Sequence, residues 1–234
     1  GGAVPIPRAY MTAGGTQTAG ILVGGDSAPG AQISSTEEYN GTAYTGGGAL
    51  NAYPPGGYVA NALGCGPQTA SIVAGGEGYP APNSTVVQEY NGASWTTSPV
   101  AYPTAAHRGG FAGTQTAGLF YGNAEPSNTL TNEWNGASFT TAPSLGTGRR
   151  NFGSCGTQTQ ALAIGGSGSP ELAITELYDG TSWAATATLG AGNDGCESTG
   201  TTTAAINTMS RVAPGTQTEE YTGAIAETQT LTTS

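Results

Sequence analysis

The sequence predicts an all-β fold, a five-bladed β-propeller with four short strands in each blade. Three observations support this prediction. A glycine-bounded apolar phrase recurs five times along the 234 residues, a second phrase with a Tyr-Asn-Gly pattern follows it, and successive copies are 43 to 51 residues apart. A period of about 40 to 50 residues is typical of propellers and other repeat arrays.

The first phrase predicts one buried strand in each repeat. Its first copy reads GTQTAGILVGG, and the five copies occupy Gly15–Gly25, Gly66–Gly76, Gly113–Asn123, Gly156–Gly166 and Gly200–Ser210. The apolar runs inside it are bounded by glycines and are too short for helices, as expected for buried strands. The closing Gly-Gly predicts a strand end where the backbone has positive φ or lies close to a neighbour. The third copy has an asparagine at the second glycine, and the fifth copy lacks both glycines.

The second phrase predicts a hairpin with an aromatic residue on each side of its turn. Its copies occupy Glu37–Tyr44, Gln88–Trp95, Asn132–Phe139, Glu176–Trp183 and Glu219–Ala226. The Asn-Gly or Asp-Gly pair predicts a two-residue type I′ turn, with positive φ at Gly41, Gly92, Gly136 and Gly180. The aromatic residues after the turn are Tyr44, Trp95, Phe139 and Trp183. We expect these rings to pack between neighbouring blades, where each buries a large area.

The repeats predict a single domain over residues 1–234. The five blades span about residues 8–52, 53–104, 105–148, 149–192 and 193–234. Residues 3–7 (AVPIP) align with residues 100–104 (VAYPT), the tail of a fourth strand, so we expect residues 1–7 to complete or latch onto the last blade. Five blades can close a ring within one chain. The alternative is an open arc that another chain completes.

Four strands per unit, a strand that ends in Gly-Gly and a later Tyr-x-x-x-x-Trp resemble the Kelch repeat. The resemblance covers residues 8–230, and all of its motifs recur in register. This chain departs from the family in the tight turn between the tyrosine and the tryptophan, where Kelch repeats usually have a longer loop. The GTQTA…GG…EYNG pattern also resembles Kelch-like modules in structural proteins of marine bacteriophages. That resemblance implies a virion protein.

Composition excludes several classes of function. The chain has five arginines, no lysine and a formal net charge of −10, so it has no basic stripe for a phosphate backbone. No stretch approaches the length of about 20 apolar residues that a membrane helix needs. Cys65, Cys155 and Cys196 form neither a disulfide framework nor a zinc-site spacing, and we expect small buried side chains there.

Candidate catalytic residues do not form a recognisable constellation. Glutamate recurs at one repeat position, at Glu38, Glu89, Glu133 and Glu220, with Leu177 in the fourth repeat. A residue repeated in this way is expected to be part of the blade. Several acidic residues occur only once, namely Asp26, Glu77, Glu125, Glu171, Asp194, Glu197 and Glu227, and no pair of them indicates acid catalysis. His107 is the only histidine, and we expect a surface or packing role for it. We therefore expect no enzyme, no metal and no cofactor.

Residues outside the repeat pattern are the candidates for binding. Four tyrosines lie in connections or in the segments after Gly-Gly: Tyr53, Tyr58, Tyr79 and Tyr102. Exposed tyrosines on a rigid frame suit contacts with sugars or proteins. The segments after Gly-Gly vary most between repeats, and we expect them to form loops on one face. They are Asp26–Thr36, Glu77–Val87, Ala124–Thr131 and Ser167–Thr175.

The sequence therefore favours a non-enzymatic binding or scaffold module. The leading expectation is a structural or attachment protein of a bacteriophage virion, whose partners are other virion proteins or cell-surface glycans. The alternative is a secreted multivalent lectin, in which weak repeated sites gain avidity. A five-bladed glycosidase ranks last. We expect a virion or extracellular location, no nucleic acid and no membrane insertion, and a homo-oligomer stays open.

Overall fold

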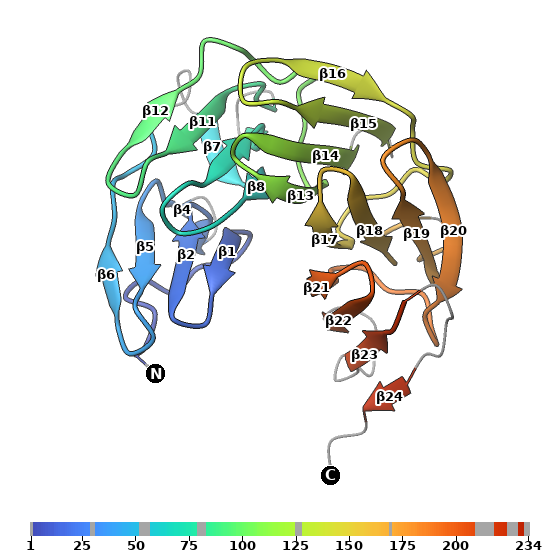
Figure 1. Cartoon of the computed structure of the whole chain (residues 1–234). Helices are drawn as coiled ribbons and strands as arrows, with labels where there is room; N and C mark the ends of the chain where they lie inside the picture. The colour runs from blue at the N-terminus through green and yellow to red at the C-terminus, as the bar shows by residue number, and fades with distance from the viewer. Residues whose placement is uncertain are drawn as a thin grey trace. The chain divides into compact units, whose positions relative to one another are not determined.

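The computed structural model shows an all-β fold with five four-stranded antiparallel sheets (Figure 1), as the sequence predicts. These sheets are the blades of a five-bladed β-propeller, and no helix occurs in the part of the chain that the structure describes. The structure describes residues 2–28, 31–51, 57–78, 83–124, 128–168, 170–208, 218–223 and 229–231. In each blade the strands lie side by side in chain order, and neighbouring strands run antiparallel.

The chain divides into two compact units. The first unit comprises residues 1–107 and 114–116, and the second comprises residues 108–113 and 117–234. The first unit contains the first two blades and two additional two-stranded ladders. The second unit contains the other three blades, except for the hairpin tip at residues 114–116.

Eight strands form the two blades of the first unit. The first blade consists of β1 (Thr12–Thr16), β2 (Ala19–Val23), β5 (Thr36–Tyr39) and β6 (Tyr44–Gly46). The second blade consists of β8 (Leu63–Cys65), β9 (Ile72–Ala74), β11 (Val87–Tyr90) and β12 (Trp95–Thr97). The two short ladders pair β3 (Asp26–Ala28) with β4 (Ala31–Gln32), and β7 (Gly57–Ala60) with β10 (Glu77–Gly78).

Twelve strands form the three blades of the second unit. The third blade consists of β13 (Gly110–Thr114), β14 (Ala117–Asn123), β15 (Asn128–Trp134) and β16 (Phe139–Ala142). The fourth consists of β17 (Gly153–Thr157), β18 (Gln160–Ile164), β19 (Ile174–Tyr178) and β20 (Trp183–Thr188). The fifth consists of β21 (Glu197–Thr201), β22 (Ala204–Thr208), β23 (Thr218–Tyr221) and β24 (Gln229–Leu231). Each of the five sheets lies within one of the expected blade segments.

The turn of the second phrase corrects one prediction. Gly41, Gly92, Gly136 and Gly180 have φ of 92°, 88°, 89° and 93°, so positive φ at the glycine is confirmed. The two-residue type I′ turn is wrong, because Tyr39 pairs with Tyr44 and four residues lie between them. Asn40 is outside the positive-φ region, and its Oδ1 accepts hydrogen bonds from the backbone N–H groups of Thr42 and Ala43. The asparagine side chain closes the turn in place of the second positive φ.

The Gly-Gly pair ends its strand for the two reasons that the sequence suggested. Gly25 has φ of 96°, and a Cβ atom there would lie 2.5 Å from the carbonyl oxygen of Ala9. The close approach allows a hydrogen-bonded bridge between Ala9 and Asp26, the residue after the pair. Glycine is therefore required both by backbone conformation and by space.

Apolar residues from neighbouring blades share a core within each unit. In the first unit, Ile21 and Val23 of β2 pack with Cys65, Val73 and Trp95 of the second blade. In the second unit, Leu119 and Tyr121 belong to one core with residues of the fourth blade, and Leu162 and Ile164 to another with residues of the fifth. The cores therefore lie between sheets.

The first residues of the chain contact the first blade through a backbone hydrogen bond of Gly2. The backbone N–H of Gly2 donates a hydrogen bond to the carbonyl oxygen of Thr42 at a distance of 2.8 Å. Thr42 belongs to the turn between β5 and β6. Completion of the last blade by residues 1–7 stays a prediction.

Candidate functional site

The glutamine of the GTQT hairpin joins successive blades. Gln68 Nε2 lies 3.0 Å from the carbonyl oxygen of Gly20 and 3.1 Å from that of Tyr39, both in the first blade. The same two repeat positions accept bonds from the other glutamines. Gln115 donates to Ser71 and Tyr90, and Gln158 donates to Gly118 and Trp134. The repeated glutamine is thus a structural clamp, a role that sequence reasoning missed although the residue recurs in the phrase.

The fifth blade lacks this clamp because Thr202 occupies the glutamine position. Replacing Thr202 with glutamine should place an amide near the carbonyl oxygens of Ala161 and Tyr178, the equivalent acceptors in the fourth blade. We expect Thr202→Gln to stabilise the protein by about 1 kcal/mol, the net value of a typical hydrogen bond. Denaturant titration measures the change, and Thr202→Glu is the control that has the same length but cannot donate. Equal stability of the two variants would contradict the clamp.

Two of the repeated glutamates, Glu38 and Glu133, also serve the contacts between blades. Glu38 accepts a hydrogen bond from the hydroxyl of Tyr90 at 2.8 Å, and Glu133 accepts one from the hydroxyl of Tyr178 at 2.9 Å. In the fourth blade Leu177 replaces the glutamate, and the hydroxyl of Tyr221 lies 3.3 Å from Thr186 Oγ1 instead. The interpretation of the repeated glutamates as part of the blade therefore agrees with the contacts of Glu38 and Glu133, and it stays a prediction for Glu89 and Glu220.

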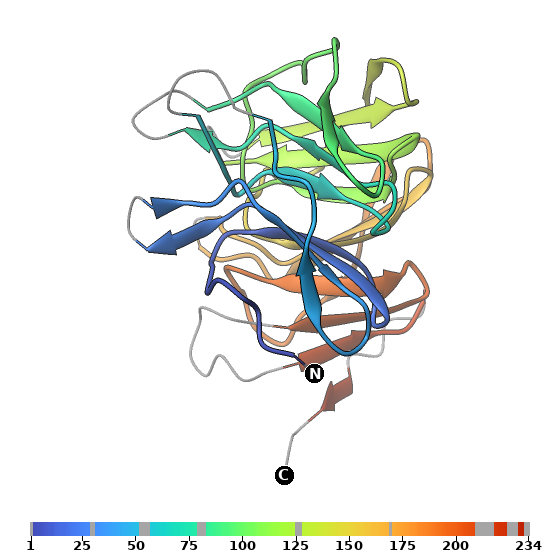
Figure 2. The ribbon, with the colours of Figure 1, turned by 90° about the vertical axis from the view of Figure 1, so that its left-hand side faces the viewer.

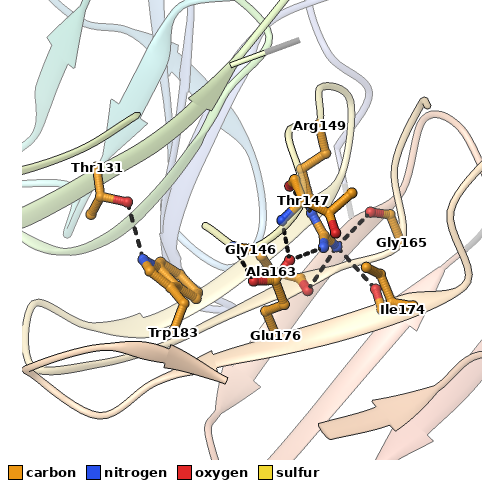
Figure 3. Close-up of polar contacts among 9 residues, drawn as sticks. All are labelled: Thr131, Gly146, Thr147, Arg149, Ala163, Gly165, Ile174, Glu176 and Trp183. Atoms are coloured by element: carbon orange, nitrogen blue, oxygen red, sulfur yellow. Dashed lines mark hydrogen bonds and ion pairs between the residues drawn. The ribbon is translucent and has the colours of Figure 1, made fainter. Parts of the chain in front are cut away.

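The tryptophans after the turns lie between blades, as predicted from the sequence. Trp95 is 4% exposed, and its ring centroid lies 4.9 Å from that of Tyr90. Its Nε1 donates a hydrogen bond to Thr36 Oγ1 of the first blade. Trp183 is half-buried and donates from Nε1 to Thr131 Oγ1 of the third blade (Figure 3). Tyr44 and Phe139 hold the same position and are also half-buried.

A buried arginine forms an ion pair inside the fourth blade. Arg149 is fully buried, and its Nη2 donates to Glu176 Oε1 (Figure 3). Its Nη1 donates to the carbonyl oxygens of Gly165 and Ile174 at 3.0 Å each. The same carboxylate accepts hydrogen bonds from the backbone N–H groups of Gly146 and Thr147. Burial lowers the pKa of the Arg149 guanidinium, and the Glu176 charge opposes that shift.

The first blade repeats this ion pair at the equivalent positions. Arg8 Nη2 lies 3.0 Å from Glu37 Oε1, and Arg8 Nη1 donates to the carbonyl oxygens of Gly24 and Ser35. Sequence reasoning missed both pairs, because Arg8 and Arg149 lie in connections that look unlike one another. Both pairs are internal to a blade and are not accessible to a ligand.

The fifth blade has the glutamate of this pair without the arginine. Glu219 is buried and accepts a hydrogen bond from the N–H of Gly190, and Asn193 occupies the arginine position. Both amide atoms of the buried Asn193 side chain lack a partner among the described residues. Burial raises the pKa of Glu219, and the hydrogen bond from Gly190 opposes that shift.

The raised pKa of Glu219 makes stability depend on pH. A carboxyl with a higher pKa in the folded state binds its proton more tightly there, which stabilises the fold at low pH. This contribution to the free energy of unfolding is lost as the pH rises from the ordinary glutamate pKa through the raised one. We expect Glu219→Gln to be more stable than the wild type at neutral pH and to show a weaker decline over that window. Melting temperatures of the two proteins across the acid range check this. A steeper decline in the variant would contradict it.

Segments outside the repeat come together on the first unit. The ladder between β7 and β10 pairs Ala60 with Glu77 and Gly57 with Gly78, so the long first connection lies beside the loop after the second Gly-Gly. The hairpin of β3 and β4, which follows the first Gly-Gly, extends away from the four strands of the first blade (Figure 2). Strand β4 also lies against β7. We call the described residues of these three segments (residues 26–28, 31–32, 57–61 and 77–78) the loop face.

An acidic pair lies at the base of the loop face. Asp26 and Glu77 each follow a Gly-Gly pair, and the Nδ2 atom of Asn61 donates to Glu77 Oε2 at 2.7 Å. Burial raises the pKa of Asp26, and the charge of Glu77 raises it further. Sequence reasoning did not single out this pair, although the shared position after Gly-Gly was a usable signal. The loop face thus presents negative charge and amide groups, which suit polar partners.

The candidate tyrosines have different outcomes. Tyr58 lies in β7 of the loop face. Tyr53 and Tyr79 lie outside the described residues. Tyr102 is 3% exposed, so the expectation that it is an exposed binding residue is wrong. Its segment is held inward by the hydrogen bond from the Tyr102 N–H to the carbonyl oxygen of Thr85.

The histidine and the thiol groups of the described ranges are buried and do not form a metal cluster. His107 is buried, so the expected packing role fits its place. The three cysteines are buried and unbridged, and burial raises the pKa of Cys65 to about 12 and that of Cys155 to about 11. No three His, Cys, Asp or Glu side chains of the described part could hold a metal ion together. A search of the same residues for a helix long and apolar enough to cross a membrane found none.

Comparison with known proteins adds no relative to this picture. No protein-family model matches the chain, and a search of curated proteins finds no significant match. The class that the structure defines is therefore the five-bladed β-propeller, and its function is inferred from the residues.

Proposed function

We propose that the chain is a non-enzymatic binding and scaffold module that contacts its partner through the loop face. One observation carries the proposal. Repeated polar residues such as Glu38, Glu133 and Gln68 are used in contacts between blades, whereas the unrepeated segments gather beside one another on the first unit. A rigid repeated frame with variable loops is a common way to present a contact surface.

The loop face suits binding better than catalysis. Its acidic residues, Asp26 and Glu77, have charges that interact, and Asn61 already holds one oxygen of Glu77. The neighbouring strand β7 contributes Tyr58, an aromatic residue of the type that contacts sugars and proteins with little loss of entropy. The combination of carboxylates, an amide and a tyrosine is typical of polar recognition.

The partner that we propose is another protein of a bacteriophage virion. The support is the resemblance of the GTQTA…GG…EYNG repeats to Kelch-like modules of marine bacteriophage structural proteins. The low content of charged residues, 9%, and the absence of lysine also agree with a particle component that must not bind nucleic acid. In this role the chain is a structural or attachment protein of the particle.

A glycan-binding role is the second candidate, favoured by the place of Tyr58 on strand β7, which pairs with Glu77 through Ala60. Carboxylates accept hydrogen bonds from sugar hydroxyls, and tyrosine rings stack on sugar faces. An attachment protein could combine both roles, whereas a secreted lectin would need no particle.

Two parallel assays test the proposal. Particles from the source culture are separated on a density gradient, and mass spectrometry measures peptides of this chain in each fraction. The purified chain is applied to a glycan array and to a panel of chromogenic glycosides. We expect the chain in the particle fraction at a constant ratio to other particle proteins and no glycoside hydrolysis. Sugar binding without particle association would favour the lectin, and hydrolysis lost on replacing one carboxylate would overturn the non-enzyme proposal.

A further inference from the structure

The fifth blade exposes an apolar residue that the other blades bury. The second strand of each blade has a large aliphatic residue at one repeat position, namely Ile21, Ile72, Leu119, Leu162 and Ile206. The first four are at most 1% exposed, whereas Ile206 is 42% exposed. In the first blade this residue shares a core with Val73 and Trp95 of the following blade. Ile206 therefore marks the face of the fifth blade on which a following blade would pack.

The fifth blade also has the polar residues that accept hydrogen bonds from the following blade elsewhere in the chain. Residues 218–221 have the same sequence, TEEY, as residues 36–39 of the first blade. In the first blade, Thr36 accepts the Trp95 N–H and Glu38 accepts the Tyr90 hydroxyl. The fifth blade has Thr218 and Glu220 at those positions, and both residues are half-buried. We call Ile206, Thr218, Glu220 and the carbonyl groups of Ala205 and Tyr221 the trailing face.

The first blade presents the complementary set. Gln17 holds the position of the clamp residue Gln68, and it is exposed. Leu22, Tyr39 and Tyr44 hold the positions of Val73, Tyr90 and Trp95 of the second blade. These three side chains of the second blade are at most 4% exposed, whereas those of the first blade are only half-buried. The Tyr39 hydroxyl donates to the carbonyl oxygen of Gly41 in its own turn, at 2.8 Å. We call Gln17, Leu22, Tyr39 and Tyr44 the leading face.

We propose that the trailing face of one copy binds the leading face of a second copy. Gln17 Nε2 donates to the carbonyl oxygens of Ala205 and Tyr221, as Gln68 does to Gly20 and Tyr39. The Tyr39 hydroxyl moves to Glu220, and Leu22 covers Ile206. The contact joins two different faces, the trailing face of one copy and the leading face of the next. It is therefore heterologous and joins copies head to tail. It is independent of the loop face and of any virion partner.

The charge of the chain gives this association a recognisable salt dependence. Copies with a formal net charge of −10 repel one another at long range, and salt screens that repulsion. The proposed contact is made of apolar groups and hydrogen bonds, which salt weakens little. We therefore expect added salt to strengthen the association, the opposite of an interface built on ion pairs.

Sedimentation velocity of the full chain with two single variants tests the proposal. Ile206→Arg blocks the trailing face, and Gln17→Glu blocks the leading face by placing a carboxylate against two carbonyl oxygens. Both positions are exposed, so both variants should keep the wild-type melting temperature. Thr96→Arg, at an exposed position of β12 outside both faces, is the matched charge control.

The expected pattern has three parts. The wild type and Thr96→Arg form species larger than a dimer as concentration rises, because each added copy keeps one free face. Each blocked variant associates more weakly than the wild type by about tenfold or more. An equal mixture of the two blocked variants forms dimers and nothing larger, because one intact pair of faces remains. A wild type that stays monomeric at its highest soluble concentration would overturn the proposal, as would a mixture that does not dimerise. No partner is present, so these outcomes do not bear on loop-face binding.

Discussion

Replacing Trp95 with alanine should cost about 3–5 kcal/mol of unfolding free energy. The side chain is 4% exposed, shares a core with Ile21 and Val23 of the first blade and packs on Tyr90. Removing it leaves a cavity between two blades that the backbone cannot fill. Denaturant titration followed by circular dichroism measures the loss.

Two further variants separate the contributions of the tryptophan. Thr36→Val removes the acceptor of the Trp95 N–H and keeps the volume, so it should cost about 1–3 kcal/mol, the penalty for an unpaired buried donor. Trp183→Ala should cost less than Trp95→Ala because Trp183 is only half-buried. A change within about 0.5 kcal/mol for Trp95→Ala, the range of ordinary surface sites, would mean that the blades do not pack through these rings.

Replacing Arg149 with methionine should cost about 3–5 kcal/mol, because it leaves the buried carboxylate of Glu176 without its counter-charge. The guanidinium also satisfies the carbonyl oxygens of Gly165 and Ile174, which would lose a donor. The loss should appear in denaturant titration and as a lower melting temperature.

The double variant Arg149→Met with Glu176→Leu is the control for this prediction. It removes both charges, so it should recover a large part of the stability lost by Arg149→Met alone. Arg8→Met tests the equivalent pair in the first unit and should show a loss of the same order. If the double variant is no more stable than Arg149→Met, the loss comes from packing, and the ion pair does not hold the blade.

The strands and the blade contacts could be predicted because they repeat. Five copies of one pattern located the buried strands, the positive φ at Gly41 and its equivalents, and the tryptophans between blades. Repetition also separated Glu38 and Glu133 from catalytic candidates before any contact was known. The turn type was wrong because Asn-Gly permits both a type I′ turn and a turn that the asparagine side chain closes, and local sequence does not distinguish them.

The contacts that do not repeat could not be predicted. The ladder of β7 with β10 joins segments about 20 residues apart, and neither segment has an alternating pattern. The proximity of Asp26 and Glu77 depends on blades one and two together, and the buried pair of Arg149 and Glu176 joins a connection to a strand. Tyr102 was expected on the surface because it lies in a connection outside the repeat pattern, but a backbone hydrogen bond holds its segment inward.

The central claim is that the loop face binds the partner and that the repeated residues join blades. The most direct test is the dissociation constant of two variants for the particle or glycan that the first assays identify. Tyr58→Ser changes the loop face, and Tyr178→Phe removes a hydrogen bond between blades. We expect Tyr58→Ser to weaken binding about tenfold or more with an unchanged melting temperature, and Tyr178→Phe to lower the melting temperature with unchanged binding. Normal binding by Tyr58→Ser together with weakened binding by Tyr178→Phe would contradict the claim.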